Sequence, residues 1–104
     1  MIVVSIDHIP GKNYQVLGMV QGAMVQTVHA GKDIFNSFKT LVGGELNSYT
    51  EMMNTSRATA ASRMVDQANA IGADAILNVR YTSSQVMQGA SEVLAYGTAV
   101  KFID

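Results

Sequence analysis

Residues 45–71, ELNSYTEMMNTSRATAASRMVDQANAI, carry the longest regular pattern in the chain and decide its fold. Apolar side chains recur in this stretch at the helical period of about 3.6 residues. They are Leu46, Tyr49, Met53, Ala60, Ala61, Met64, Ala68 and Ile71. Gly72 follows where a C-terminal cap belongs. The pattern predicts one long helix, and its many alanines allow close packing on a sheet.

Strand patterns lie on both sides of this helix. Apolar β-branched residues precede a turn at Pro10-Gly11, and a second strand pattern has a period of two without any charge. After the helix, two further strand patterns form a hairpin through Gln88-Gly89. The predicted strands are residues 1–6, 14–29, 75–83 and 92–103. Asp33 is predicted to cap a short helix over residues 34–42, which Gly43-Gly44 ends.

Alternation along a strand divides its side chains between two faces. In the second strand, one face carries Val16, Gly18, Val20, Gly22 and Met24, and the other carries Leu17, Met19, Gln21, Ala23 and Val25. In the last strand, one face carries Val93, Ala95, Gly97 and Ala99, and the other carries Leu94, Tyr96, Thr98, Val100 and Phe102. The small residues of the last strand suit the alanine-rich helix. Leucine at Ala61 or valine at Gly97 is therefore expected to overpack this contact, whereas alanine at Lys12 should be nearly neutral.

These elements predict a single α+β domain over residues 1–104. Its order is β-β-α-α-β-β, with a two-layer antiparallel sheet, one long helix and one short helix. A helix layer covers only one face of a sheet, yet both faces of the long strands are poor in charge. We therefore expect other copies of the chain to cover the second face.

The composition supports this expectation of self-association. Charged residues make up 14% of the chain, whereas about 25% is usual. The absence of cysteine excludes disulfides and thiolate metal sites. A net charge of -1 gives no footprint for nucleic acid. With no basic leader, and with glutamines interrupting the uncharged residues 13–31, the chain is expected to be cytoplasmic and free of membrane spans.

The chain resembles the YbjQ family, whose members carry a heavy-metal-binding label but have no settled activity. The motifs that carry the resemblance are Gly18-Met19-Val20-Gln21-Gly22, Val42-Gly43-Gly44-Glu45 with Tyr49, Arg57, Arg63-Met64, Gly72-Ala73-Asp74-Ala75-Ile76, Glu92-Val93 and Tyr96-Gly97-Thr98-Ala99-Val100. The resemblance implies a dodecin-like subunit that assembles into a homopentameric ring, with short extra strands linking neighbours. A divalent metal is implied by the resemblance alone.

Arg57 is the most distinctive polar residue of the long helix, because it lies on the apolar stripe and no acidic residue is three or four positions away. A guanidinium at a boundary needs a carboxylate partner, and Glu92 and Glu45 are the candidates. The set is either a structural ion pair or a clamp for an anion. Tyr96 and Thr98 are polar groups in an apolar strand, which either bond across the sheet or line a pocket between subunits. Tyr49 completes this group of candidate ligand or interface residues.

Metal candidates are few. Asp7 with His8, and His29 with Asp33, offer two pairs of nitrogen and oxygen ligands that could join across a subunit boundary, although neither spacing matches a recognised motif and solvated histidines are the alternative. The seven methionines suit core packing better than a soft-metal site.

The sequence thus predicts a ring-forming homo-oligomer, its partner being the chain itself, that binds a metal ion or small ligand at subunit interfaces. The first alternative is an assembly protein without a small ligand. The second is an enzyme that uses Arg57, Glu92 and Tyr96 at an interface.

Overall fold

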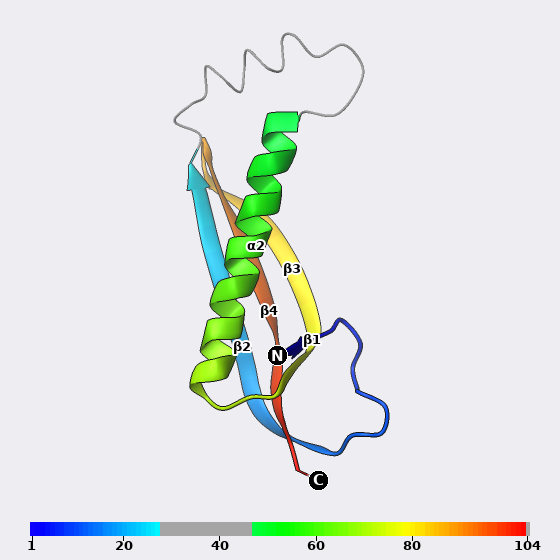
Figure 1. Cartoon of the computed structure of the whole chain (residues 1–104). Coiled ribbons are helices and arrows are strands. Elements are labelled where there is room, and N and C mark those ends of the chain that lie inside the picture. The colour runs from blue at the N-terminus through cyan, green and yellow to red at the C-terminus, as the bar shows by residue number, and fades with distance from the viewer. Residues whose placement is uncertain (28–46, 104) are drawn as a thin grey trace.

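The computed structural model describes residues 1–27 and 47–103, with helix side chains from Thr50 onward. Its elements are β1 (Ile2–Val3), β2 (Tyr14–Thr27), α2 (Asn47–Ala70), β3 (Ala75–Met87) and β4 (Ala90–Phe102). One sheet with the strand order β1-β3-β4-β2 lies against α2 (Figure 1). The predicted α+β architecture of two layers is confirmed for this part of the chain. The predicted short helix over residues 34–42 lies outside it.

The sheet is mixed, so the prediction of a fully antiparallel sheet is wrong at one pair of strands. β1 runs parallel to β3, with Ile2 beside Ala75, while β4 pairs antiparallel with both β3 and β2. β1 and β2 lie at opposite edges of the sheet, so the chain between them crosses the sheet rather than turning in a hairpin. The parallel pair is β1 and β3, which are not consecutive in the chain. The long connection between them, through β2 and α2, permits parallel pairing. β1 is also shorter than the predicted strand over residues 1–6.

The long helix begins and ends within two residues of its predicted bounds. Its buried stripe has a spacing of four residues and comprises Ser56, Ala60, Met64 and Ala68. Gly72 closes the helix with a φ of 79°, and the amide of Ala73 donates a hydrogen bond to the carbonyl of Ala68 at 3.0 Å. Ile71 is 48% exposed, contrary to prediction, because the chain has already left the helix there. Ala61 is half-buried.

The helix lies close to β2 because position 22 carries no side chain. A Cβ built on Gly22 would lie 2.2 Å from the carbonyl oxygen of Ala60 and 2.3 Å from the amide nitrogen of Met64. Real Cβ atoms do not approach backbone atoms so closely. Glycine at this position therefore sets the distance between the two layers.

A bulge in β2 changes the predicted faces of two residues. The pairing with β4 shifts between Val16 and Gly18, which leaves Leu17 as the extra residue. Leu17 consequently packs into the core under the helix, whereas Val16 lies on the opposite face. From Gly18 onward the predicted alternation is confirmed, with Val20 buried and Met19 exposed.

Two apolar clusters occupy opposite faces of the sheet. The cluster under α2 contains Val93, Ala95 and Ala99, as predicted for that face of β4. The other face of the sheet, here called the outer face, carries a smaller cluster around Leu77 and Val100. It is covered by the chain's own N-terminal segment and the sheet end, namely Val4, Ile9, Tyr14 and Phe102. Of the described residues, these cover only one end of the outer face.

Candidate functional site

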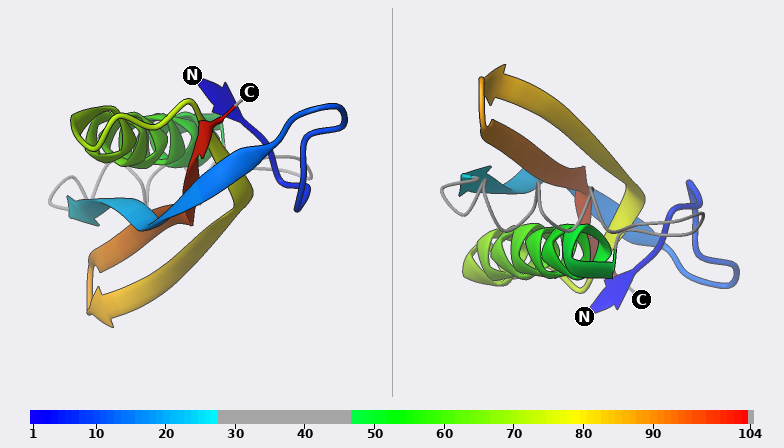
Figure 2. Two further views of the ribbon diagram at one scale, coloured as in Figure 1. Left: turned by 90° about the horizontal axis from the view of Figure 1, so that it is seen from below. Right: turned by 90° about the horizontal axis from the view of Figure 1, so that it is seen from above.

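A bulge in β3 opens a groove beside α2. The pairing with β4 shifts between Leu77 and Arg80, and Asn78 adopts a positive φ of 54°. The shift of one residue turns Tyr81 and Ser83 toward the helix side, where they pair with Ala95 and Val93. Beyond the bulge the hairpin of β3 and β4 diverges from α2, as both views in Figure 2 show. The helix therefore covers β2 but leaves the far half of β3 open.

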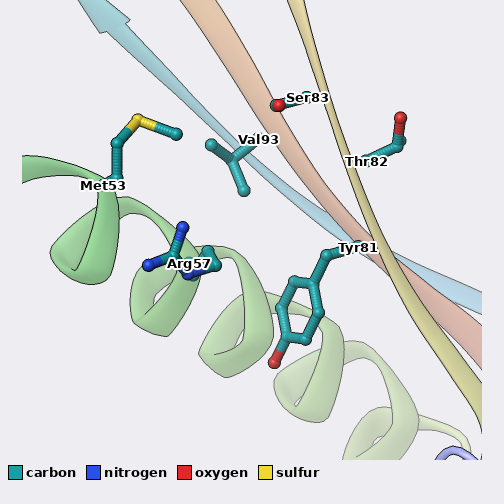
Figure 3. A pocket seen from close by; sticks show the side chains of 6 residues that line it. All are labelled: Met53, Arg57, Tyr81, Thr82, Ser83 and Val93. Carbon is teal, nitrogen blue, oxygen red and sulfur yellow. The ribbon is translucent and has the colours of Figure 1, made fainter. Parts of the chain in front are cut away.

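The groove has a volume of about 130 Å³. Its lining residues are Met53, Arg57, Tyr81, Thr82, Ser83 and Val93 (Figure 3). Tyr81 extends from β3 toward α2, whereas the side chain of Thr82 points away from the helix. The volume is below the roughly 300 Å³ at which sites for drug-sized ligands begin, so the groove suits only a small ligand.

Among the described lining residues, Arg57 alone carries a charge. Its Nη2 donates a hydrogen bond to Oδ1 of Asn54, one turn earlier on α2. A guanidinium has five N–H donors in a planar fork, so most of its donors remain available to a ligand. The side chain is exposed, which means that water rather than protein solvates most of its charge.

Arg57 and three other predicted residues, Glu92, Tyr96 and Thr98, lie on opposite sides of the sheet of one chain. Glu92, Tyr96 and Thr98 are half-buried and alternate with residues that face α2, so they share the outer face of β4. Arg57 lies on the helix side. The structure therefore does not gather Arg57, Glu92 and Tyr96 of one chain on the same face of the sheet.

Of the remaining predicted candidates, Asp7 and His8 do not line the groove. His8 Nδ1 and Asp7 Oδ1 are 2.8 Å apart on an exposed segment. The hydrogen bond from His8, and then its charge, lower the pKa of Asp7. Within residues 1–27 and 47–103, no three histidine, aspartate or glutamate side chains gather as metal ligands. His29, Asp33 and Glu45, together with the side chain of Tyr49, lie outside the part of the chain that the structure describes.

Sequence reasoning missed the β3 contribution to the groove. Tyr81 and Ser83 carried no motif, and the strand pattern gave no sign of the bulge that turns them toward α2. The hydroxyl of Ser56 was also missed. It is fully buried and lies 2.9 Å from the carbonyl oxygen of Met52 and 3.1 Å from Oε1 of Gln26. This contact ties the helix to the end of β2 and is structural.

Comparison with known proteins settles the family. The family model described as "Putative heavy-metal-binding", of the YbjQ family, matches residues 1–103. This chain belongs to the YbjQ family. The membership predicted from the sequence motifs is thereby confirmed.

Relatives of this YbjQ-family chain match it over nearly its whole length. A UPF0145 protein of Alkaliphilus metalliredigens is 55% identical over 103 residues, which are 99% of this chain and 100% of that protein. A UPF0145 protein of Thermosipho africanus is 55% identical over 102 residues, 97% of this chain and 94% of that protein.

A solved structure shares the fold. It is the crystal structure of a protein of unknown function from the DUF74 family of Pediococcus pentosaceus, with a TM-score of 0.71 at 15% identity, covering 99% of this chain and 98% of that one. In the described part of the YbjQ-family chain, no helix has the length and apolar character needed to cross a membrane.

Proposed function

We propose that the chain is a ring-forming homo-oligomer that binds a small ligand or metal ion near its subunit boundaries. The observation that carries the proposal is the apolar outer face of β2, which residues 1–27 and 47–103 leave exposed. Val16, Met19 and Val25 share this face and are 62%, 75% and 51% exposed. Clusters of exposed apolar side chains on one face mark interaction sites.

The occupant that fits this face best is a second copy of the chain. The sheet ends in β2 at one edge, a strand of fourteen residues that contains no charge and no proline. At the other edge, β1 pairs with the first residues of β3, and no residue of the described part pairs with the strand from Arg80 to Met87 on that side. Proteins usually protect long edges with lysine or proline, and β2 has neither. Pairing or covering of these edges by further copies supports a ring.

The dodecin-like subunit and the homopentamer extend this proposal. The two edges differ, because side chains of α2 already bond two backbone groups of β2: Arg63 donates to the carbonyl of Ala23, and Gln67 accepts from the amide of Gln21. Two different edges favour head-to-tail contacts, which close into a ring when the rotation between copies permits it. The number five comes from the family resemblance, because the closing angle is not encoded in one chain. Residence in the cytoplasm likewise stays a prediction, which cell fractionation tests.

Light scattering coupled to gel filtration tests the assembly with a charge placed on the outer face. The double variant Met19→Lys, Val25→Lys buries two ammonium groups in the proposed interface, so it should elute at the mass of one chain, 11.1 kDa, while the wild type elutes at a multiple. Asn69→Lys is the matched control, because Asn69 is exposed on α2 away from the sheet. An assembled double variant would contradict the proposed interface.

Metal binding has one specific observation in its favour. Asp7 and His8 already lie within hydrogen-bond distance and provide one oxygen and one nitrogen ligand. A complete site needs three or four ligands, so pairs from adjacent copies would have to combine. Elemental analysis and calorimetric titration with zinc, copper and nickel test this version. Heat that disappears in His8→Asn supports it, whereas the absence of both heat and metal leaves the ligand-free assembly protein as the better account.

A further inference from the structure

We propose that the groove between α2 and β3 binds a small organic carboxylate with an apolar body, and that Arg57 anchors its negative end. The inference rests on the proposed ligand-binding role, and it does not depend on the number of subunits in the ring. Four properties of the groove carry it: its charge, its hydroxyl groups, its apolar surface and its size.

The charge of the groove selects an anion. Arg57 gives the described part of the lining a charge of one, and none of the other described lining residues is acidic. The hydrogen bond to Asn54 Oδ1 restrains the guanidinium on the groove side of α2. Guanidinium groups bind carboxylates through two parallel hydrogen bonds, which are stronger than hydrogen bonds between neutral groups. A guanidinium that shares the described lining with no carboxylate is suited to such a ligand.

The opposite wall adds polar groups to the lining. Tyr81 and Ser83 come from β3, and their hydroxyls can donate to a carboxylate oxygen. Both residues are directed to this side by the bulge at Asn78, so the strained backbone serves to shape the groove. Charge and hydroxyls therefore approach the ligand from two different elements.

The base of the groove selects an apolar body. Met53 from α2 and Val93 from β4 line it, and Val93 belongs to the core beneath the helix. A thioether adapts to the shape of aliphatic or aromatic groups and makes favourable contacts with aromatic rings. Inorganic phosphate would leave this surface unfilled and would place two negative charges against one guanidinium. A metal cation would be repelled by the positive charge of Arg57, and the described lining offers it only a thioether and hydroxyls as side-chain ligands. The groove therefore does not suit a metal ion.

The volume of about 130 Å³ limits the ligand to about the size of a single ring. An apolar cavity of about 150 Å³ binds benzene, so the groove suits a small aromatic acid. Benzoate is a suitable probe because its ring matches the apolar base and its carboxylate matches Arg57. Benzamide has nearly the same shape without the charge, which isolates the contribution of the guanidinium.

Methyl NMR of the full chain in its native assembly tests the inference. Benzoate should shift the methyl signals of Met53 and Val93 in a saturable titration and should leave the methyl signal of Met19, on the outer face, unchanged. Benzamide and inorganic phosphate should bind at least about tenfold more weakly, since a hydrogen bond to a charged group is worth about a factor of ten or more. Arg57→Gln should weaken benzoate by a similar factor.

Arg63→Gln is the matched control, because it removes the same charge from the same helix while its native hydrogen bond goes to the carbonyl of Ala23 on β2. The inference is overturned if Arg57→Gln still binds benzoate, or if Arg63→Gln weakens benzoate binding as much as Arg57→Gln does. It is also overturned if benzamide or phosphate binds with the same affinity as benzoate. The lack of any shift of Met53 overturns it as well. Light scattering on the same samples separates the two proposals, since an assembled Arg57→Gln variant without benzoate binding confirms that the anchor acts on the ligand and not on the ring.

Discussion

Replacing Gly22 by alanine tests how the two layers are held together. The new Cβ would lie 2.2 Å from the carbonyl oxygen of Ala60, whereas Cβ atoms essentially never approach another heavy atom within 3.0 Å. The helix must therefore retreat by about 0.8 Å, the difference between these two distances. Both of the closest contacts are with backbone atoms, so no side chain can rotate to relieve them. We expect a loss of about 2–3 kcal/mol, the upper part of the usual range for overpacking.

Urea and thermal unfolding, followed by circular dichroism at one fixed protein concentration, measure this loss. Holding the concentration constant matters because association adds to the apparent stability. For a domain of this size the expected loss lowers Tm by roughly 10–20 °C. Gln21→Ala is the control, since its side chain is exposed on the same strand and should change the free energy of unfolding by less than about 0.5 kcal/mol. A Gly22→Ala variant as stable as the control would refute the close approach of α2 to β2.

Three further outcomes are expected. Gly97→Val should cost about 1–3 kcal/mol in the same unfolding assay, because the added Cβ would lie 2.9 Å from a carbonyl oxygen of β3; an unchanged midpoint would count against that packing. Lys12→Ala should lower the free energy of unfolding by no more than about 1 kcal/mol, since the ammonium of Lys12 lies 5.2 Å from the ring centre of Phe102 at the surface. A larger loss would show that Lys12 makes a further stabilising contact. His8→Asn should raise the pKa of Asp7 toward its ordinary value in an NMR titration. The pKa of Asp7 is lowered in the folded chain, so the Asp7–His8 contact should persist above about pH 4 and be lost as the pH falls below that value. If His8→Asn leaves the pKa of Asp7 unchanged, His8 is not the cause of the lowered pKa.

The elements with a clear period were predictable from the sequence. The spacing of Ala60, Met64 and Ala68 identified both the helix and its buried side, and Gly72 marked its end. The alternation in β4 assigned Val93 to the helix side correctly. These predictions succeed because the pattern depends on local geometry alone, and each face has one environment along its length.

The bulges were not predictable. Each inserts one residue against a partner strand, so the alternation reverses without a change in residue type, as at Val16 and Leu17. The same effect in β3 made the groove unpredictable, because Tyr81 is turned toward α2 only after the shift near Asn78.

The sequence also overstated the packing at Ala61. Because that position is half-buried, leucine there should overpack less than expected from the sequence.

The candidate site was predictable only in part. Arg57 was identified because it breaks an apolar stripe, and the structure places it in the groove lining. Its expected partner Glu92 lies on the outer face of β4, because it alternates with Val93, which faces the helix. The helix side is decided by small residues such as Gly22, whose close contacts appear only in three dimensions.

Native mass spectrometry of the wild-type chain at micromolar concentration tests the central claim most directly, because the exposed apolar face of β2 is expected to be shielded by other copies. The predicted result is one closed species at a multiple of 11.1 kDa, with five copies expected from the family resemblance. A single-chain species of 11.1 kDa that persists over that concentration range would contradict the claim.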